Sequence, residues 1–246
     1  MSSVKAVFKK QFKGTVNNPE ILMQFIIYPL LALVLNLLVV TDFEGIPYEI
    51  AAMLTENMPN MVTMQATIFV GMGIITVMGG IVAADIEKKS IRFLMMAGVK
   101  PGAYLLGVSG VILLVSIGTS AAFSLIGEFS GTDFWIFTAA MMSATVCSVI
   151  LGATIGIITK NQQSASAISL PLAAVLAFGP MMAQFNDVAA RFLHPVYTQH
   201  LNVIAAYLKT GGNDMILWQS FAIILANAVL LSILFAIAYT KKGMKN

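Results

Sequence analysis

Residues 83–107, AADIEKKSIRFLMMAGVKPGAYLLG, form a short charged segment between two long apolar runs. Five formal charges lie within residues 85–92, whereas the runs on either side carry none. An apolar run of about 20 residues is long enough to cross a bilayer as a helix. The pattern therefore predicts a polar loop over 85–100 that joins two membrane spans.

The composition of the whole chain agrees with a membrane protein. Of the 246 residues, 58% are hydrophobic and only 10% are charged, against about 25% charged in an average soluble domain. So few charges cannot cover a water-soluble surface, which indicates an integral membrane protein. The single cysteine, Cys147, lies in an apolar run. It allows no disulfide within one chain, and we interpret it as a small core residue.

Six charge-free runs are long enough to span a membrane, and none shows the alternation of a β-barrel strand. The predicted fold is an all-α integral membrane protein with six transmembrane helices in a single domain over 1–246. We expect Pro171 and Gly179-Pro180 to break the fifth span. The predicted spans cover about 21–41, 61–84, 103–127, 134–159, 164–184 and 216–240.

The distribution of lysine and arginine predicts the orientation. With six spans, 12 of the 14 basic residues fall on one side of the membrane. Cytoplasmic loops carry such an excess, so we expect both termini to be cytoplasmic and the protein to lie in the cell (plasma) membrane. The net charge of +3 then reflects topology, and no nucleic-acid partner is expected.

Two segments outside the spans have helical patterns. Residues 3–13 place Val4, Phe8 and Phe12 on one face and lysines on the other, which predicts a helix lying in the membrane interface. The alternative is a simple basic flank that orients the first span. Residues 185–214 predict two short, broken outer helices between spans five and six, separated by Pro195.

Several functions are disfavoured by missing motifs. None of the six runs has an acidic or basic residue well inside it, unlike most ion-coupled transporters. The HExxH and GxSxG motifs of hydrolases are absent. Residues 102–107 have the glycine spacing of a phosphate-binding loop, but Val108-Ser109 replaces the required Lys and Ser or Thr. His194 and His200 lack the spacing of a helical metal pair. We therefore expect no enzyme, metal or cofactor in this chain, and any energy must come from a partner.

The charged segment and its surroundings resemble the membrane subunit of type-2 ABC exporters. The resemblance is carried by EKKSIRFL at 87–94, AGVKP at 97–101, YLLG at 104–107 and VNNPE at 16–20. It extends over essentially the whole chain, with Lys89-Ser90 standing where the family usually has Gly-Thr. The resemblance implies a homodimer or heterodimer of permeases and two copies of a separate ATPase that binds ATP and Mg²⁺.

The resemblance also implies roles for individual residues. In such exporters a coupling helix between spans two and three sits in a cleft of the ATPase. The sequence between spans two and three agrees with a short helix, because the apolar residues Ile91, Leu94 and Met95 have the spacing i, i+3 and i+4. We expect Glu87 and Arg92 to make polar contacts with the ATPase, and Leu94 and Met95 to make apolar ones.

The substrate path of the family lies at the dimer interface. The second span is rich in methionine, threonine and glycine, and Met64, Thr67 and Gly71 are its candidate lining residues. The alternative for these three is plain dimer packing.

The near absence of charge on this path favours an amphipathic or apolar cargo. Compact permeases of this kind resemble bacterial exporters of cytolytic or antimicrobial peptides, including the phenol-soluble modulin exporters, so export of a membrane-active peptide is the first expectation. Alternatives are a drug or lipid efflux permease, or a membrane immunity or sensor protein that transports nothing.

Overall fold

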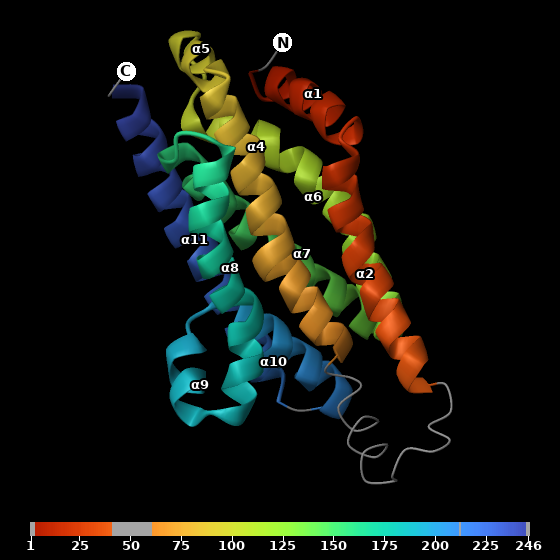
Figure 1. Cartoon of the computed structure of the whole chain (residues 1–246). Coiled ribbons are helices and arrows are strands. Elements are labelled where there is room, and N and C mark those ends of the chain that lie inside the picture. The colour runs from red at the N-terminus through yellow and green to blue at the C-terminus, as the bar shows by residue number, and fades with distance from the viewer. Residues whose placement is uncertain (1–2, 41–60, 212, 245–246) are drawn as a thin grey trace.

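The chain forms a helical bundle in the computed structural model, which describes residues 3–40, 61–211 and 213–244 (Figure 1). Within these ranges no residue is in a β-strand, and six helices are long and apolar enough to cross a membrane. The predicted all-α integral membrane fold with six spans is thus confirmed. In chain order, the spans are α2 (Pro19–Val40), the helix Met61–Glu87, α6 (Pro101–Ile126), α7 (Gly131–Ile158), α8 (Gln162–Phe185) and α11 (Asp214–Met244).

In the described ranges, four shorter helices lie outside the spans. They are α1 (Ser3–Val16), α5 (Ser90–Met96), α9 (Asp187–Leu193) and α10 (Tyr197–Thr210). Figure 1 shows α1 and α5 at the end of the bundle that also bears both termini, and α9 and α10 at the opposite end. The two short helices predicted between spans five and six correspond to α9 and α10.

The second span is the most buried helix of the bundle. In its apolar window 78% of the residues are buried, compared with 11% in α11. It packs on α7, where glycines permit close approach: a Cβ atom added at Gly156 would lie 2.6 Å from Val82 Cβ. Most of the surface of α2 and α11 is instead apolar and exposed, as expected for helices that face lipid or another subunit.

The second span also changes its helical geometry midway. It is π-helical over η1 (Phe69–Ile74) and continues as α4 (Ile75–Glu87). Three aromatic rings pack around Phe69 at centroid distances of 5.7–6.0 Å, namely those of Phe25, Tyr28 and Phe123. Such π segments are uncommon and are often found at functional sites.

The predicted break in the fifth span was wrong. Helix α8 is continuous from Gln162 to Phe185 with both Pro171 and Pro180 inside it. A proline removes only one backbone donor, and packed neighbours in a membrane bundle can satisfy the carbonyl that it frees. The helix ends instead at Phe185. The side chain of Asn186 then caps α9 by accepting hydrogen bonds from the backbone amides of Val188 and Ala189.

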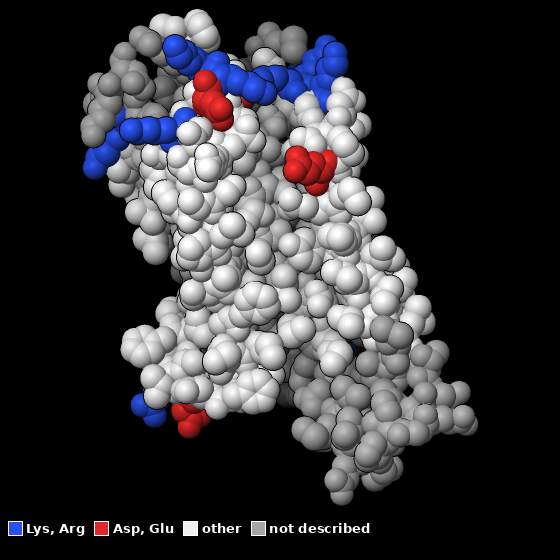
Figure 2. All heavy atoms as spheres, in the orientation of Figure 1, with Lys and Arg blue, Asp and Glu red and all other residues white. Residues whose placement is uncertain are grey.

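Basic residues gather at one end of the molecule. Figure 2 shows lysine and arginine concentrated around α1, α5 and the termini, above a middle zone that lacks charge. We call this the basic end. Helix α1 lies there on α6, with Val7 buried against Gly107 and Phe12 exposed. Gln11 and Thr15 are buried as well, so the packed face of α1 is only partly the predicted stripe of Val4, Phe8 and Phe12.

Candidate functional site

The segment between the second and third spans is mostly helical. Helix α4 runs to Glu87, and a sharp turn follows in which Lys89 adopts a positive φ of 57°. Helix α5 then covers Ser90–Met96, and Pro101 occupies the start of α6. The loop predicted over 85–100 thus begins three residues too early, because α4 continues through residues 85–87.

Leu94, one of the two predicted apolar contacts of α5, is not among its exposed apolar side chains. Ile91 is buried and Leu94 is half-buried against the core, so this face of the helix is directed at the bundle. Phe93 and Met96, at i and i+3, are instead 65% and 67% exposed. Both Phe93 with Met96 and Ile91 with Leu94 have the i, i+3 spacing of one helix face in the sequence. In the structure, the face with Ile91 and Leu94 packs inward. The side chains of Arg92 and Met95, two of the predicted contacts, lie outside the described part of the structure.

Glu87 joins the turn after the second span to the turn before the fifth span, at the basic end. Its side chain is exposed, and Oε2 accepts a hydrogen bond of 3.3 Å from the backbone amide of Gln162, the first residue of α8. A carboxylate at a helix N-terminus compensates the free backbone amides there. Asn161 caps the same helix through a hydrogen bond from Ser164 N. Glu87 therefore ties the end of α4 to the start of the fifth span.

Asp85 is a buried carboxylate that joins three helices. Its Oδ1 atom is 2.5 Å from Lys10 Nζ in α1, and its Oδ2 atom accepts a 3.1 Å hydrogen bond from the Tyr104 hydroxyl in α6. An unpaired charge in such a place is strongly destabilising, so the two donors account for its burial. Sequence reasoning placed Asp85 among loop charges, because it directly follows a charge-free run.

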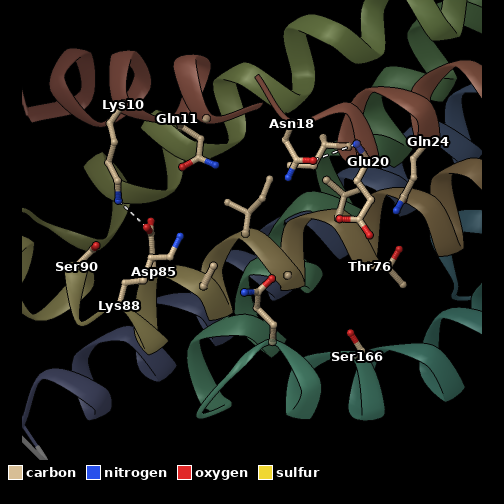
Figure 3. A pocket seen from close by; sticks show the side chains of 17 residues that line it. Lys10, Gln11, Asn18, Glu20, Gln24, Thr76, Asp85, Lys88, Ser90 and Ser166 are labelled. Atoms are coloured by element: carbon tan, nitrogen blue, oxygen red, sulfur yellow. Dashed lines mark hydrogen bonds and ion pairs between the residues drawn. The ribbon is translucent and has the colours of Figure 1, made fainter. Parts of the chain in front are cut away.

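A polar cleft of about 510 Å³ opens beside this cluster, between α1, α2, α4 and α8. Figure 3 shows the Lys10–Asp85 pair at one side of the cleft, and Glu20, Gln24 and Thr76 on the other. Asn18 caps α2 by accepting a hydrogen bond from Glu20 N at 3.0 Å, which fixes the first turn of that helix. The cleft is thus lined by charged and amide groups although it lies among membrane-spanning helices.

Met64 and Thr67 line a smaller, apolar groove nearer the opposite end. The groove has a volume of about 220 Å³ and lies between the second span, α8 and α10. The Thr67 hydroxyl donates to Thr63 O at 2.8 Å and accepts a 3.0 Å hydrogen bond from Asn202 Nδ2. Two of the three predicted path residues thus share one groove, and one of them is fastened to α10.

Gly71, the third predicted path residue, lies in a helix contact. A Cβ atom added there would be 2.9 Å from the backbone nitrogen of Ala177 in α8. The residue does not line either cavity. Gly71 therefore lies where the π-helical turn packs closely against the backbone of α8.

The two histidines form a structural contact. The Nε2 atom of His200 lies 2.7 Å from the His194 carbonyl, which can only accept, so Nε2 carries the proton and Nδ1 accepts from the Ser220 hydroxyl at 3.1 Å. Burial lowers the pKa of His200 below its usual 6.5. Among the described residues no group of three or more His, Cys, Asp or Glu side chains is placed to hold a metal ion.

Comparison with known proteins assigns most of this chain to one family. The family model described as ABC-2 type transporter matches residues 2–206, which extend from α1 into α10. A search of curated proteins gave no match.

Proposed function

The chain belongs to the ABC-2 type transporter family and is a multi-pass membrane permease component, and we propose that it is the transport subunit of an exporter driven by a separate ATPase. In this proposal, two permeases pair and each engages one ATPase subunit, which binds ATP and Mg²⁺. The basic end faces the cytoplasm, in keeping with the excess of lysine in cytoplasmic loops.

The observation that carries the proposal is the exposed face of α5. Phe93 and Met96 are large, exposed apolar side chains on a short helix at the basic end of the bundle. Exposed apolar groups rimmed by charge are typical of protein interaction sites. Glu87 connects the same segment to the start of α8, so a partner docked on α5 acts on several spans together.

Two further features support outward movement of an amphipathic peptide. The larger cleft lies at the basic end, where a cytoplasmic cargo could load, and the smaller groove toward the other end is lined mainly by methionine and other apolar side chains. Methionine offers an adaptable apolar surface. A cargo with both polar and apolar parts fits these linings better than a highly charged polymer does.

The test is assembly with an ATPase. The permease is purified in nanodiscs together with a candidate ATPase subunit that carries a GxxxxGK[ST] loop, and ATP hydrolysis is measured with and without amphipathic peptides. Stable assembly with peptide-stimulated hydrolysis supports the proposal. Stimulation by drugs or lipids alone would reassign the cargo, and failure to assemble would favour a membrane immunity or sensor protein.

A further inference from the structure

Three exposed lysines form a row along α1. Lys5, Lys9 and Lys13 have the spacing i, i+4 and i+8 and so share one face of the helix. A buried residue follows each of them by two positions, and two residues turn an α-helix by about 200°. The lysine row, as we call these three residues, therefore points away from the bundle. Within the described chain α1 makes its ion pair through Lys10 with Asp85, and the row has no carboxylate partner there.

The row lies at the depth of the membrane surface. Helix α1 packs on the first three turns of the span α6. Val7 lies against Gly107 there, and Phe8 is 3.1 Å from a Cβ atom added at Gly110. The exposed Phe12 stacks on Phe8 with ring centroids 6.0 Å apart. A helix with lysines on one side and aromatic rings on another, placed where a span begins, lies among lipid head groups.

An apolar groove runs between α2 and α6, which lie side by side beneath α1 (Figure 1). Its volume is about 540 Å³, and every residue that lines it is uncharged. The lining hydroxyl of Thr119 already donates to Phe25 O at 3.3 Å. The groove is open on its outer side: Ile26 and Leu30 are exposed, and a Cβ atom added at Gly118 would meet no atom within 4 Å. The polar cleft shares none of these residues and lies on the α4 side of α2.

The lysine row and the groove are separated by the thickness of a head-group layer. Phe8 contacts α6 at Gly110, and the groove begins on the same helix at Val115. Five residues of α-helix span about 7.5 Å. The polar layer of one leaflet is about 5–8 Å thick, half the difference between the full bilayer and its hydrocarbon core. A phospholipid whose phosphate lies beside α1 therefore has its acyl chains at the level of the groove.

We propose that α1 and the groove together bind an anionic phospholipid, whose phosphate contacts the lysine row and one of whose acyl chains occupies the groove. Lysines near a bilayer surface attract anionic lipids, and each adds to the attraction. A second copy of the chain fits this face less well. In a two-fold dimer it would bring its own lysine row toward the first, and like charges across an interface repel. This inference goes beyond the proposed exporter and needs neither its cargo nor its ATPase.

The experiment compares two lipids that differ in head-group charge. The full chain in a neutral detergent is titrated with phosphatidylglycerol or with phosphatidylcholine of the same acyl chains, and bound lipid is counted by native mass spectrometry. We expect phosphatidylglycerol to bind about tenfold more tightly, which is less than the full attraction of three lysines because each is exposed and screened. Equal affinities of the wild type for the two lipids would overturn the proposal.

Replacing the lysine row tests the head-group contact. In Lys5→Gln/Lys9→Gln/Lys13→Gln we expect the affinity for phosphatidylglycerol to fall about tenfold, to that for phosphatidylcholine. The matched control removes three exposed lysines elsewhere at the basic end and should keep the preference: Lys100→Gln/Lys160→Gln/Lys241→Gln. A preference that survives loss of the row, or that disappears equally in the control, would overturn the head-group contact.

Filling the groove tests the acyl-chain contact independently. The new side chain in Gly118→Leu enters the open space beside that residue. We expect both lipids to bind about fourfold more weakly, as for one displaced methylene group of the chain, while phosphatidylglycerol stays preferred. Unchanged affinities would overturn the groove as the acyl-chain site. The same spectra count subunits: a smaller dimer fraction in Gly118→Leu, with both lipids bound as in the wild type, would assign the groove to a second copy instead.

Discussion

Lys10 Nζ lies 2.5 Å from Asp85 Oδ1, although the two residues are 75 positions apart in the chain. The Lys10 side chain is 48% exposed and the Asp85 side chain only 9%. The carboxylate therefore depends on the contact more than the ammonium does, since a buried charge without a partner is the costlier of the two. The pair fixes α1 to the end of the second span.

Replacing Lys10 should destabilise the permease moderately. Lys10→Met leaves the buried carboxylate with Tyr104 as its donor, and solvent screening at Lys10 limits the loss to about 1–2 kcal/mol, or about 2–8 °C in melting temperature. Thermal unfolding in detergent measures it, with the exposed Lys9→Met as the control. The double variant Lys10→Met/Asp85→Asn should recover most of the loss. Equal melting temperatures for the two lysine variants would contradict the prediction.

The exposed face of α5 should matter for assembly and little for folding. We expect Phe93→Ala/Met96→Ala to weaken ATPase association at least about tenfold, as for apolar anchors of an interface, with an unchanged melting temperature. Leu94→Ala should instead lower the melting temperature, because Leu94 packs on the core. Phe192→Ala in α9, a residue that is also largely exposed but lies at the other end, is the matched control. Unaltered association in the double variant would remove α5 from the interface.

Glu87 should affect coupling more than assembly. Glu87→Ala removes the acceptor of Gln162 N, and we expect the ATPase still to bind while peptide-stimulated hydrolysis falls about threefold, the loss of one weak charged contact. Hydrolysis by the purified complex measures this, and Asp187→Ala is the control. If peptide-stimulated hydrolysis is the same in Glu87→Ala as in the wild type, Glu87 has no part in coupling.

Gly71 should not tolerate even one methyl group. In Gly71→Ala the new Cβ would meet the backbone of Ala177 at 2.9 Å, which cannot rotate away as a side chain can. A cost of about 1–3 kcal/mol follows, seen as a lower melting temperature. Gly118→Ala, with no neighbour within 4 Å of its Cβ, should keep or raise stability. Similar behaviour of the two variants would mean that the helices are not in close contact.

Stability should decrease as the pH falls below about 6.5. Burial lowers the pKa of His200 in the folded protein, so the unfolded chain binds a proton there that the folded chain does not. The stabilisation is therefore present above the unfolded pKa and is lost as the pH falls below it. Melting temperatures between about pH 7.5 and 5.5 test this. His200→Asn should flatten the slope, whereas His194→Asn keeps the backbone carbonyl that His200 uses and should retain it.

Features set by one-dimensional patterns could be predicted from the sequence. The six spans follow from charge-free runs, because a bilayer accepts few other segments. The amphipathic stripe of Val4, Phe8 and Phe12 likewise corresponds to α1, and the grouping of Met64 with Thr67 agrees with their one-turn spacing.

Features that depend on contacts between distant segments could not be predicted from the sequence. Nothing near Asp85 in the sequence reveals Lys10 or Tyr104, so its burial was missed. The inward face of α5 is decided by the bundle beneath it, which selects Ile91 and Leu94 and leaves Phe93 outside. Pro180 remains inside a helix because its neighbours cover it, which no local propensity records.

The π-helical segment Phe69–Ile74 sets the two halves of the second span out of phase. The π-helical turn holds one more residue than an α-helical turn. Side chains after the segment are therefore rotated about the helix axis by about 100°, the angle of one residue, relative to their positions in an uninterrupted α-helix. This phase brings Thr67 to Asn202 at one end and Asp85 to Lys10 at the other. Deletion of a single residue within 69–74 would restore a regular helix and point one of these two side chains away from its partner. The number of residues in this segment is therefore constrained independently of their chemistry.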